Sequence, residues 1–565
     1  MKKVIINILS ILAVASMATG CIKETVPQGS TLTAGQLSAK SSALATMVAG
    51  IPAAMMTSDY AGYLSNYNAH TDFGLPAVHL MTEYMLEDLA TLGANPYYNR
   101  FYAQCLNQYQ GSRYIYCAYF WTCYYSWIKA ANDVIRLINE ETADEATLKV
   151  LGHAYAYRAY CYLDLARMFE PKEPGVAYAG YDLTKVKGLT VPKVTETTTE
   201  KEAGNNPRLP HDKMYEFILA DLTKADSLLL GSNDGYSLPS EHAVDGLFAR
   251  AYLEMGAYCK ENGDAPNAAI YYDKAVEHAK KVIDSNDYSP LTQDQWEDPA
   301  NGFNNGSAND SWIWGLRVAD ENVENIICFT AHIASEGQWG YAPLAQIGIN
   351  KALYDRIPDS DFRKHSWLDP SFENYYAYKF AGSAKDKSIF LNGDKELGQP
   401  KAKAYQNIKF RPKGGICDDY ASGNSTDHML MRIEEMYFIA AEASAMTGKF
   451  AVAQKYLGDL IKTRNPDYDC SGFGTESSFI KEMMLQKRIE FWGEGVLFFD
   501  YKRLGLGITR GYSGTNHAAV YAYNSTGRSP QWNFVITRSE FQANKGIGDD
   551  DNNPDPSNLL ELWSE

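Results

Sequence analysis

Five charged residues lie close together near the C-terminal end of the chain, and they are the first candidates for chemistry. They are Arg488, Glu490, Glu494, Asp500 and Arg503. Two carboxylates at a suitable distance can act as general acid and base, as in glycoside hydrolysis. Carboxylates mixed with arginines at helical spacing also form structural ion-pair networks. We expect the structural role here, with one helix whose paired charges edge a packed apolar face.

Common catalytic motifs are absent from the sequence. No G-x-S-x-G, H-E-x-x-H or G-x-x-x-x-G-K-[ST] segment occurs, so the motifs of serine hydrolases, zinc proteases and P-loop enzymes are missing. The acidic segment DDDNNPDP near the C-terminus has Pro554 where a calcium loop requires glycine. The ten histidines are scattered. We therefore predict no catalytic residue, no metal site and no cofactor.

Two segments combine aromatic rings with polar side chains, which is the chemistry of sugar binding. A sugar presents apolar C–H faces edged by hydroxyls, so its site requires exposed rings for stacking and polar groups for hydrogen bonds. We predict ligand contacts from both segments, and packing of the tyrosines between helices is the competing interpretation for the first of them. The candidates are Tyr97, Tyr98 and Asn99 in the first segment and Trp339 and Tyr341 in the second, together with Trp296.

The remaining tryptophans that lie inside periodic segments are expected in the core. They are Trp121, Trp127, Trp312, Trp314 and Trp492.

Most of the chain predicts helices that pack in pairs. Apolar residues recur at three- and four-residue steps over residues 124–169, 243–283 and 428–464. A helix hairpin with apolar surface on both sides requires neighbouring pairs to bury it. In the last range, small and aromatic residues fall close to the positions of a tetratricopeptide repeat. These residues are Ala441, Gly448, Phe450, Ala453, Tyr456 and Leu460.

Between Trp296 and Pro412 the pattern changes to loops and short alternating runs. Asn, Gly and Asp cluster at 301–310, and the run 311–318 predicts a strand. The fold class is therefore mostly α, with helix pairs of tetratricopeptide type and an irregular lobe that contains short β-strands.

The C-terminal charges resemble the signature of the SusD/RagB family of outer-membrane lipoproteins. The resemblance also includes the helix expected over 433–448, while Leu497 stands where the family usually has arginine and Gly493 replaces a usual apolar residue. We expect these two departures to weaken one ion pair. The matching residues are Arg488, Glu490, Glu494, Gly495, Phe498, Asp500 and Arg503.

The resemblance implies one SusD-like body over residues 41–565. Its helical scaffold is expected over 41–290 and 428–505, its ligand-facing lobe over 291–427, and a C-terminal segment over 506–565.

The first 20 residues have the form of a bacterial lipoprotein signal peptide. Lys2 and Lys3 precede an apolar run over 4–14, and small residues lead to Cys21. The run is shorter than the ~20 residues of a bilayer span. We expect cleavage before Cys21, acylation of Cys21 and a tether over 21–40, which anchor the protein to a membrane. The family resemblance implies the outer membrane, and Ile22, Lys23 and Glu24 resemble the short charged tag that directs Bacteroidetes lipoproteins to the cell surface. An ordinary signal peptide cut elsewhere is the competing interpretation.

Composition and charge restrict the partners. With 45% hydrophobic and 21% charged residues the chain is globular. Its net charge of −17 repels nucleic acid, so we expect no such partner. The eight cysteines after Cys21 form no C-x-x-C pair, and we expect buried free thiols. One or two disulfides are the alternative for a protein outside the inner membrane.

The resemblance implies a non-catalytic function. The protein would capture oligosaccharide and pass it to a SusC-like, TonB-dependent outer-membrane transporter. Peptide is a second candidate cargo, because an acidic surface favours basic peptides. The sequence also allows a secreted glycoside hydrolase, whose two carboxylates meet only in the fold, and a protein–protein adaptor.

Overall fold

The computed structural model describes residues 41–56, 69–92, 107–233, 235–300, 303–304, 309–318, 326–371 and 379–564. The predicted signal peptide, the lipidation site Cys21 and the candidates Tyr97, Tyr98 and Asn99 lie outside these ranges. Among the described helices, none is both long and apolar enough to span a bilayer.

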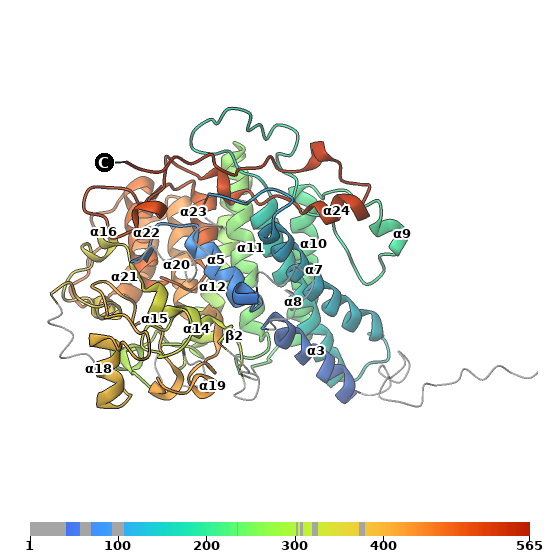
Figure 1. The fold of residues 1–565 in the computed structure, drawn as a ribbon. Helices are drawn as coiled ribbons and strands as arrows, with labels where there is room; N and C mark the ends of the chain where they lie inside the picture. The colour runs from blue at the N-terminus through green and yellow to red at the C-terminus, as the bar shows by residue number, and fades with distance from the viewer. Residues whose placement is uncertain are drawn as a thin grey trace, which may run out of the picture.

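Long helices form the body of the molecule, as Figure 1 shows. Neighbouring helices pack in sequence, with α8 against α7 and α10, α11 against α12, α12 against α20, and α20 against α21. The pairs predicted over 124–169 and 243–283 are therefore confirmed. The helices of this array are α3 (Ser41–Met55), α7 (Ile115–Leu137), α8 (Glu145–Phe169), α10 (His211–Leu229), α11 (Glu241–Glu261), α12 (Ala265–Ser285), α20 (Ile433–Met446), α21 (Phe450–Ile461) and α22 (Glu476–Glu490).

Local capping fixes where four of these helices begin, namely α8, α11, α12 and α22. The Asp144 side chain accepts a hydrogen bond from the backbone N–H of Thr147 at 2.8 Å and starts α8. Ser240 caps α11 in the same way through the N–H of Ala243. Such caps satisfy backbone donors that have no partner inside the helix, so the helix starts follow from local sequence.

An irregular lobe with short helices packs beside the array, at the lower left of Figure 1. The short helices are α5 (Leu75–Tyr84), α9 (Glu200–Ala203), α13 (Gln293–Glu297), α14 (Phe329–Ile333), α15 (Ala342–Ala345), α16 (Lys351–Tyr354), α18 (Ala384–Asn392), α19 (Tyr420–Gly423), α23 (Leu497–Leu504) and α24 (Arg538–Ala543); all but α5, α9, α23 and α24 lie between residues 293 and 423.

Three two-stranded antiparallel sheets occur within the described ranges. Strand β1 (Leu89–Thr91) pairs with β3 (Ile347–Ile349), β2 (Trp312–Leu316) with β4 (His428–Arg432), and β5 (Ile508–Thr509) with β6 (Asn524–Ser525). The strand predicted over 311–318 is thus confirmed as β2. The helix hairpin predicted from residue 428 begins instead with β4, because His428–Arg432 completes a ladder with a distant segment that periodicity does not reveal.

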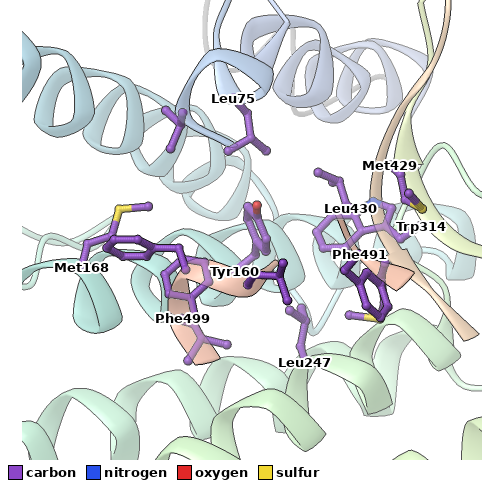
Figure 2. Close-up of a cluster of buried hydrophobic side chains, with 14 of the residues drawn as sticks. Leu75, Tyr160, Met168, Leu247, Trp314, Met429, Leu430, Phe491 and Phe499 are labelled. Atoms are coloured by element: carbon purple, nitrogen blue, oxygen red, sulfur yellow. The ribbon is translucent and has the colours of Figure 1, made fainter. Parts of the chain in front are cut away.

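A continuous apolar core joins the helices and the lobe. Figure 2 shows its centre, where Tyr160 of α8, Leu247 of α11, Trp314 of β2 and Phe499 of α23 converge. The ring centroids of Tyr160 and Trp314 are 5.2 Å apart in an edge-to-face arrangement, which is favourable for aromatic pairs. All five tryptophans expected in the core are buried, as predicted, at 6% exposure or less.

The signature residues occupy two helices rather than one. Helix α22 ends at Glu490 and α23 starts at Leu497, with Gly493 and Gly495 at φ values of +78° and +77° between them. Only glycine adopts this left-handed conformation without strain. The expectation of a single helix is therefore wrong. Glu490 at the end of α22 and Glu494 in the turn are both buried in the core.

Candidate ligand-binding site

The Trp339 loop, residues 334–341, connects α14 with α15 in the lobe. The backbone N–H of Tyr341 donates to the carbonyl of Ala331 at 2.8 Å and closes the loop. Gly340 allows this closure, because its φ is +79° and a Cβ there would lie 2.8 Å from the Ala331 Cβ. The loop is therefore folded tightly back on α14.

The Trp339 ring is held at one edge and partly exposed. Its Nε1 donates to the Asn424 Oδ1 at 2.6 Å. A Cβ on Gly423 would lie 2.5 Å from the Cη2 of the ring, so α19 packs directly on the indole. On the same short helix, the Tyr420 ring is 44% exposed. The ring is thus fixed in orientation before any ligand arrives, which lowers the entropy cost of binding.

Gln338 attaches the loop at two further points. Its backbone N–H donates to the carbonyl of Cys417 at 2.8 Å, and its Nε2 donates to the Asp386 Oδ1 at 2.6 Å. Asp386 itself caps the start of α18. The Trp339 loop is therefore supported by two segments that lie far along the chain. Asp386 is 48 residues after Gln338, and Cys417 is 79 residues after it.

Tyr341 lies beneath the loop rather than on its surface. Its side chain is 5% exposed, and its ring stacks on His332 with centroids 4.1 Å apart. Burial lowers the pKa of His332 to about 3, so the imidazole is neutral and its Nε2–H donates to the carbonyl of His70 at 2.9 Å. The prediction that Tyr341 presents an exposed ring is wrong, because this stack buries it.

Trp296 is also buried, at 4% exposure. Its Nε1 donates to the Ser366 Oγ at 2.9 Å, and its ring contacts Phe303 and Phe362. It covers the guanidinium of Arg464, whose Cζ lies 5.4 Å from the ring centroid. The prediction of a ligand-facing ring at Trp296 is therefore wrong, since this lobe side chain packs on buried charges.

The signature carboxylates Glu490 and Glu494 lie in an ionic cluster, a group of eight charged side chains that are each at most 5% exposed. The cluster has four positive and four negative members, so its charges balance. It consists of Asp361, Arg363, Lys409, Arg432, Glu434, Arg464, Glu490 and Glu494.

Glu490 is the centre of this cluster. Its oxygens accept from Arg432 at 2.7 Å, Arg464 at 2.9 Å and Arg363 at 3.0 Å. Burial alone would raise the pKa of Glu490, but the guanidiniums of Arg464, Arg432 and Arg363 hold it well below the usual range. Glu490 is thus a permanently ionised, fully enclosed carboxylate.

Glu494 completes the cluster from the turn after α22. It accepts from the Lys409 Nζ at 2.6 Å and from the Arg432 Nε at 2.9 Å. Lys409 also donates to the carbonyls of Glu490 and Trp492, which satisfies the buried ammonium. The expectation that the charges edge an apolar face is therefore wrong, because Glu490 and Glu494 lie inside the core.

The other signature residues make separate pairs. Arg488 binds Asp88 through two hydrogen bonds of 2.7 and 2.6 Å, and Arg503 binds Glu442 and Asp500. Leu497, one of the two departures from the signature, is fully buried at the start of α23. Each signature carboxylate is thus paired with a cation.

The partners of these carboxylates were missed in the sequence. Arg363, Lys409 and Arg432 lie 58 to 127 residues from the signature acids that they bind. No local spacing marks them, because each pair is made only by tertiary packing.

Within the described ranges no group of three or more His, Cys, Asp or Glu side chains is placed to hold a metal ion. The seven described cysteines there are free thiols.

Comparison with known families gives two matches that together cover most of the chain. A family described as starch-binding and associating with the outer membrane matches residues 73–253. The SusD family matches residues 274–545, which include the Trp339 loop, the ionic cluster and the signature.

Individual relatives agree with these matches. SusD-like protein P2 of Formosa agariphila is 23% identical over 439 residues, which are 74% of this chain and 75% of the relative. A SusD-like carbohydrate-binding protein from Bacteroides vulgatus has a TM-score of 0.66 at 19% identity, covering 90% of this chain and 98% of its own. Surface glycan-binding protein A from Bacteroides thetaiotaomicron, solved with laminarihexaose, has a TM-score of 0.62 at 18% identity with the same coverage.

At these identities the solved structures show the same fold. Together with the two family matches and the signature residues, they lead to one conclusion: the chain belongs to the SusD/RagB family.

Proposed function

We propose that this protein is a surface lipoprotein, anchored through Cys21, that binds oligosaccharide without cleaving it. It then passes the sugar to a SusC-like, TonB-dependent transporter in the outer membrane. Family membership supports this proposal, as does the similarity to a glycan-binding protein solved with laminarihexaose.

The observation that carries the proposal is the Trp339 ring. It is partly exposed, and the hydrogen bond to Asn424 and the contact with Gly423 fix its orientation. An indole held in this way offers a sugar a flat apolar face, and the amide groups of Gln338 and Asn424 lie beside it. Tyr97, Tyr98 and Asn99 remain proposed ligand residues on the basis of their chemistry.

The non-catalytic part of the proposal is supported by the placement of the acids. Glu490 is 0% exposed and Glu494 is 5% exposed, and arginine or lysine binds both. A glycosidase needs two carboxyl groups that reach the glycosidic bond. These signature acids cannot supply that pair without opening the core.

Isothermal titration calorimetry with neutral oligosaccharides, beginning with laminarihexaose, tests the binding. We expect heat of binding with the sugar recovered intact, and at least tenfold weaker binding by Trp339→Ala. The melting temperature of this variant should stay close to that of the native protein, because the ring is partly exposed.

Three different results would contradict the proposal. New reducing ends would identify a hydrolase, and heat only with basic peptides would identify a peptide-binding protein. No heat of binding with either oligosaccharides or basic peptides would favour the role of a protein–protein adaptor.

Membrane fractionation tests the anchor and the partner. We expect the protein in the outer-membrane fraction together with a TonB-dependent transporter, and release of Cys21→Ala into the soluble fraction. An unchanged membrane fraction in Cys21→Ala would contradict lipid anchoring.

A further inference from the structure

A narrow crevice lies between the Trp339 loop and the segments labelled α15 and α18 in Figure 1. Its volume is about 10 Å³, which is room for about one water molecule or one hydroxyl group. Gln338, Gln399 and Pro400 are partly exposed at its rim, so it opens to the surface.

The crevice and the Trp339 ring share a wall. Gly337 lines the crevice, and a Cβ on Gly337 would lie 3.3 Å from the Cε2 of Trp339. The ring therefore lies next to Gly337, which separates it from the crevice. A sugar stacked on the indole could direct one of its substituents into this space.

Ser335 gives the crevice an unused hydrogen-bonding group. The residue is 1% exposed, and its Oγ has no hydrogen-bond partner among the described residues. Buried hydroxyls are almost always paired with protein or with water. The unpaired Oγ is therefore available to a polar group that enters the crevice.

Three of the other polar side chains in the crevice are neutral. Gln338, Gln399 and Gln406 contribute carboxamides, which both donate and accept hydrogen bonds. The Gln399 Nε2 donates to the Gln338 carbonyl at 3.1 Å, and the Gln406 Oε1 accepts from the Lys403 N–H at 2.9 Å, so two carboxamides are oriented in advance.

One ionisable side chain, Glu336, also lines the crevice, and its charge is already compensated. It accepts from the Arg411 Nη2 at 3.0 Å, with both side chains buried. A charged ligand group entering the crevice would lose its hydration without gaining an uncompensated opposite charge, which is unfavourable. A neutral hydroxyl can donate and accept here at little cost.

We infer that this crevice is a subsite for one neutral hydroxyl group of a sugar whose ring stacks on Trp339. The inference rests on the proposed function and narrows it. The subsite selects neutral sugars over uronic acids and over the cationic side chains of basic peptides.

Two substitutions at Ser335 test the subsite. Ser335→Ala removes the hydroxyl and leaves the space, whereas Ser335→Val also fills it. Ser444→Ala is the matched control, because Ser444 is equally buried at 1% exposure, has an unpaired Oγ, and lies on the scaffold helix α20.

Saturation-transfer NMR would compare methyl glucoside, galactoside and mannoside with methyl glucuronide. We expect binding of at least one neutral glycoside that Trp339→Ala abolishes. Ser335→Ala should weaken it about twofold to tenfold, as expected for one lost hydrogen bond. Ser335→Val should weaken it further, and Ser444→Ala should leave it unchanged. Melting temperatures confirm that each variant is folded.

The failure of this inference differs from the failure of the proposed function. Binding that depends on Trp339 but is as strong in both Ser335 variants as in the native protein would overturn the subsite and leave the sugar-binding function intact. A preference for the glucuronide would have the same consequence. If the native protein binds neither the neutral glycosides nor laminarihexaose, the proposed function fails and the subsite fails with it.

Discussion

The ionic cluster and the Trp339 loop are both built from polar groups on segments far apart in sequence, but they use them in opposite ways. In the cluster, Glu490 is 0% exposed and is bound by three arginines. In the loop, Trp339 is partly exposed and its indole makes one hydrogen bond, to Asn424. The enclosed network fixes the frame, whereas the loop holds its indole in place and leaves it partly exposed.

This difference predicts where substitutions cost stability and where they cost binding. A variant in the cluster should lower the free energy of unfolding, and a variant in the loop should lower affinity. The predictions below run from the largest expected effect to the smallest.

Glu490→Gln should produce the largest loss. The amide keeps the size of the side chain but removes the charge that Arg363, Arg432 and Arg464 share. Removing one member of a buried ionic group costs about 3–5 kcal/mol. Urea unfolding of the purified protein measures this loss.

The control for Glu490 is the same substitution in an exposed pair. Glu216 binds Lys213 on the surface of α10 at 2.8 Å. Glu216→Gln should leave the unfolding midpoint unchanged, because exposed ion pairs contribute little. Equal effects at both positions would contradict the central role of the cluster.

Gly495→Ala should be the next most harmful change. The residue has a φ of +77°, and an added Cβ would lie 2.4 Å from the Cβ of His79. The left-handed conformation and the overlap together should cost about 2–4 kcal/mol in the free energy of unfolding.

Gly448→Ala separates these two causes. Gly448 has a φ of +76°, but no atom lies within 4 Å of an added Cβ. We expect only the conformational cost of about 1–2 kcal/mol in thermal unfolding. An equal loss at both glycines would show that the contact with His79 is unimportant.

Glu83, which borders the cluster, should make stability depend on pH. Burial, together with the neighbouring Asp88, raises its pKa to about 8, and its Oε1 accepts from the N–H of Gly495 at 3.0 Å. The folded protein therefore holds a proton that the unfolded chain releases near its usual pKa of 4.5. This contribution to stability is complete below about pH 4.5 and is lost as the pH rises through about 8.

Glu83→Gln should remove this dependence, because the amide is neutral at every pH and keeps the acceptor for Gly495. The measurement is the free energy of unfolding from urea titrations between pH 5 and pH 8 for both proteins. A difference between them that stays constant over this range would contradict the assigned protonation.

Trp339→Phe should have the smallest effect on stability. The variant keeps an aromatic face but loses the hydrogen bond to Asn424, which is worth about 1 kcal/mol. We expect affinity for a neutral oligosaccharide to fall about fivefold in calorimetry, with a nearly unchanged melting temperature. A melting temperature that falls as far as in Glu490→Gln would instead show that this ring belongs to the core.

Helix positions and the core were largely predictable from the sequence. Apolar periodicity marked α7, α8, α11 and α12, and the burial of Trp314 and Trp492 followed from their place in periodic segments. These properties depend on neighbours within a few turns of the same element, which a sequence displays directly.

The site was less predictable. Trp296, Trp339 and Tyr341 have similar local surroundings in the sequence, yet Trp339 alone of these three keeps a partly exposed ring. The Trp296 ring is bound by Ser366, 70 residues further along the chain, and the Tyr341 ring is covered by His332 of the preceding helix α14. Exposure depends on which segment packs against a ring, and spacing along the chain does not encode that.

The sequence by itself determined the family, the helical class and the residues of the C-terminal signature, because these are matters of residue type and local order. The tertiary structure alone decided that the signature bends at Gly493 and Gly495. It also decided that Glu490 binds Arg363, Arg432 and Arg464. Finally, it decided that the strand β4 replaces the first turn of the predicted helix hairpin. The physical reason is that ion pairing and strand pairing act between atoms that are close in space, and only the completed packing of helices and lobe brings those segments together.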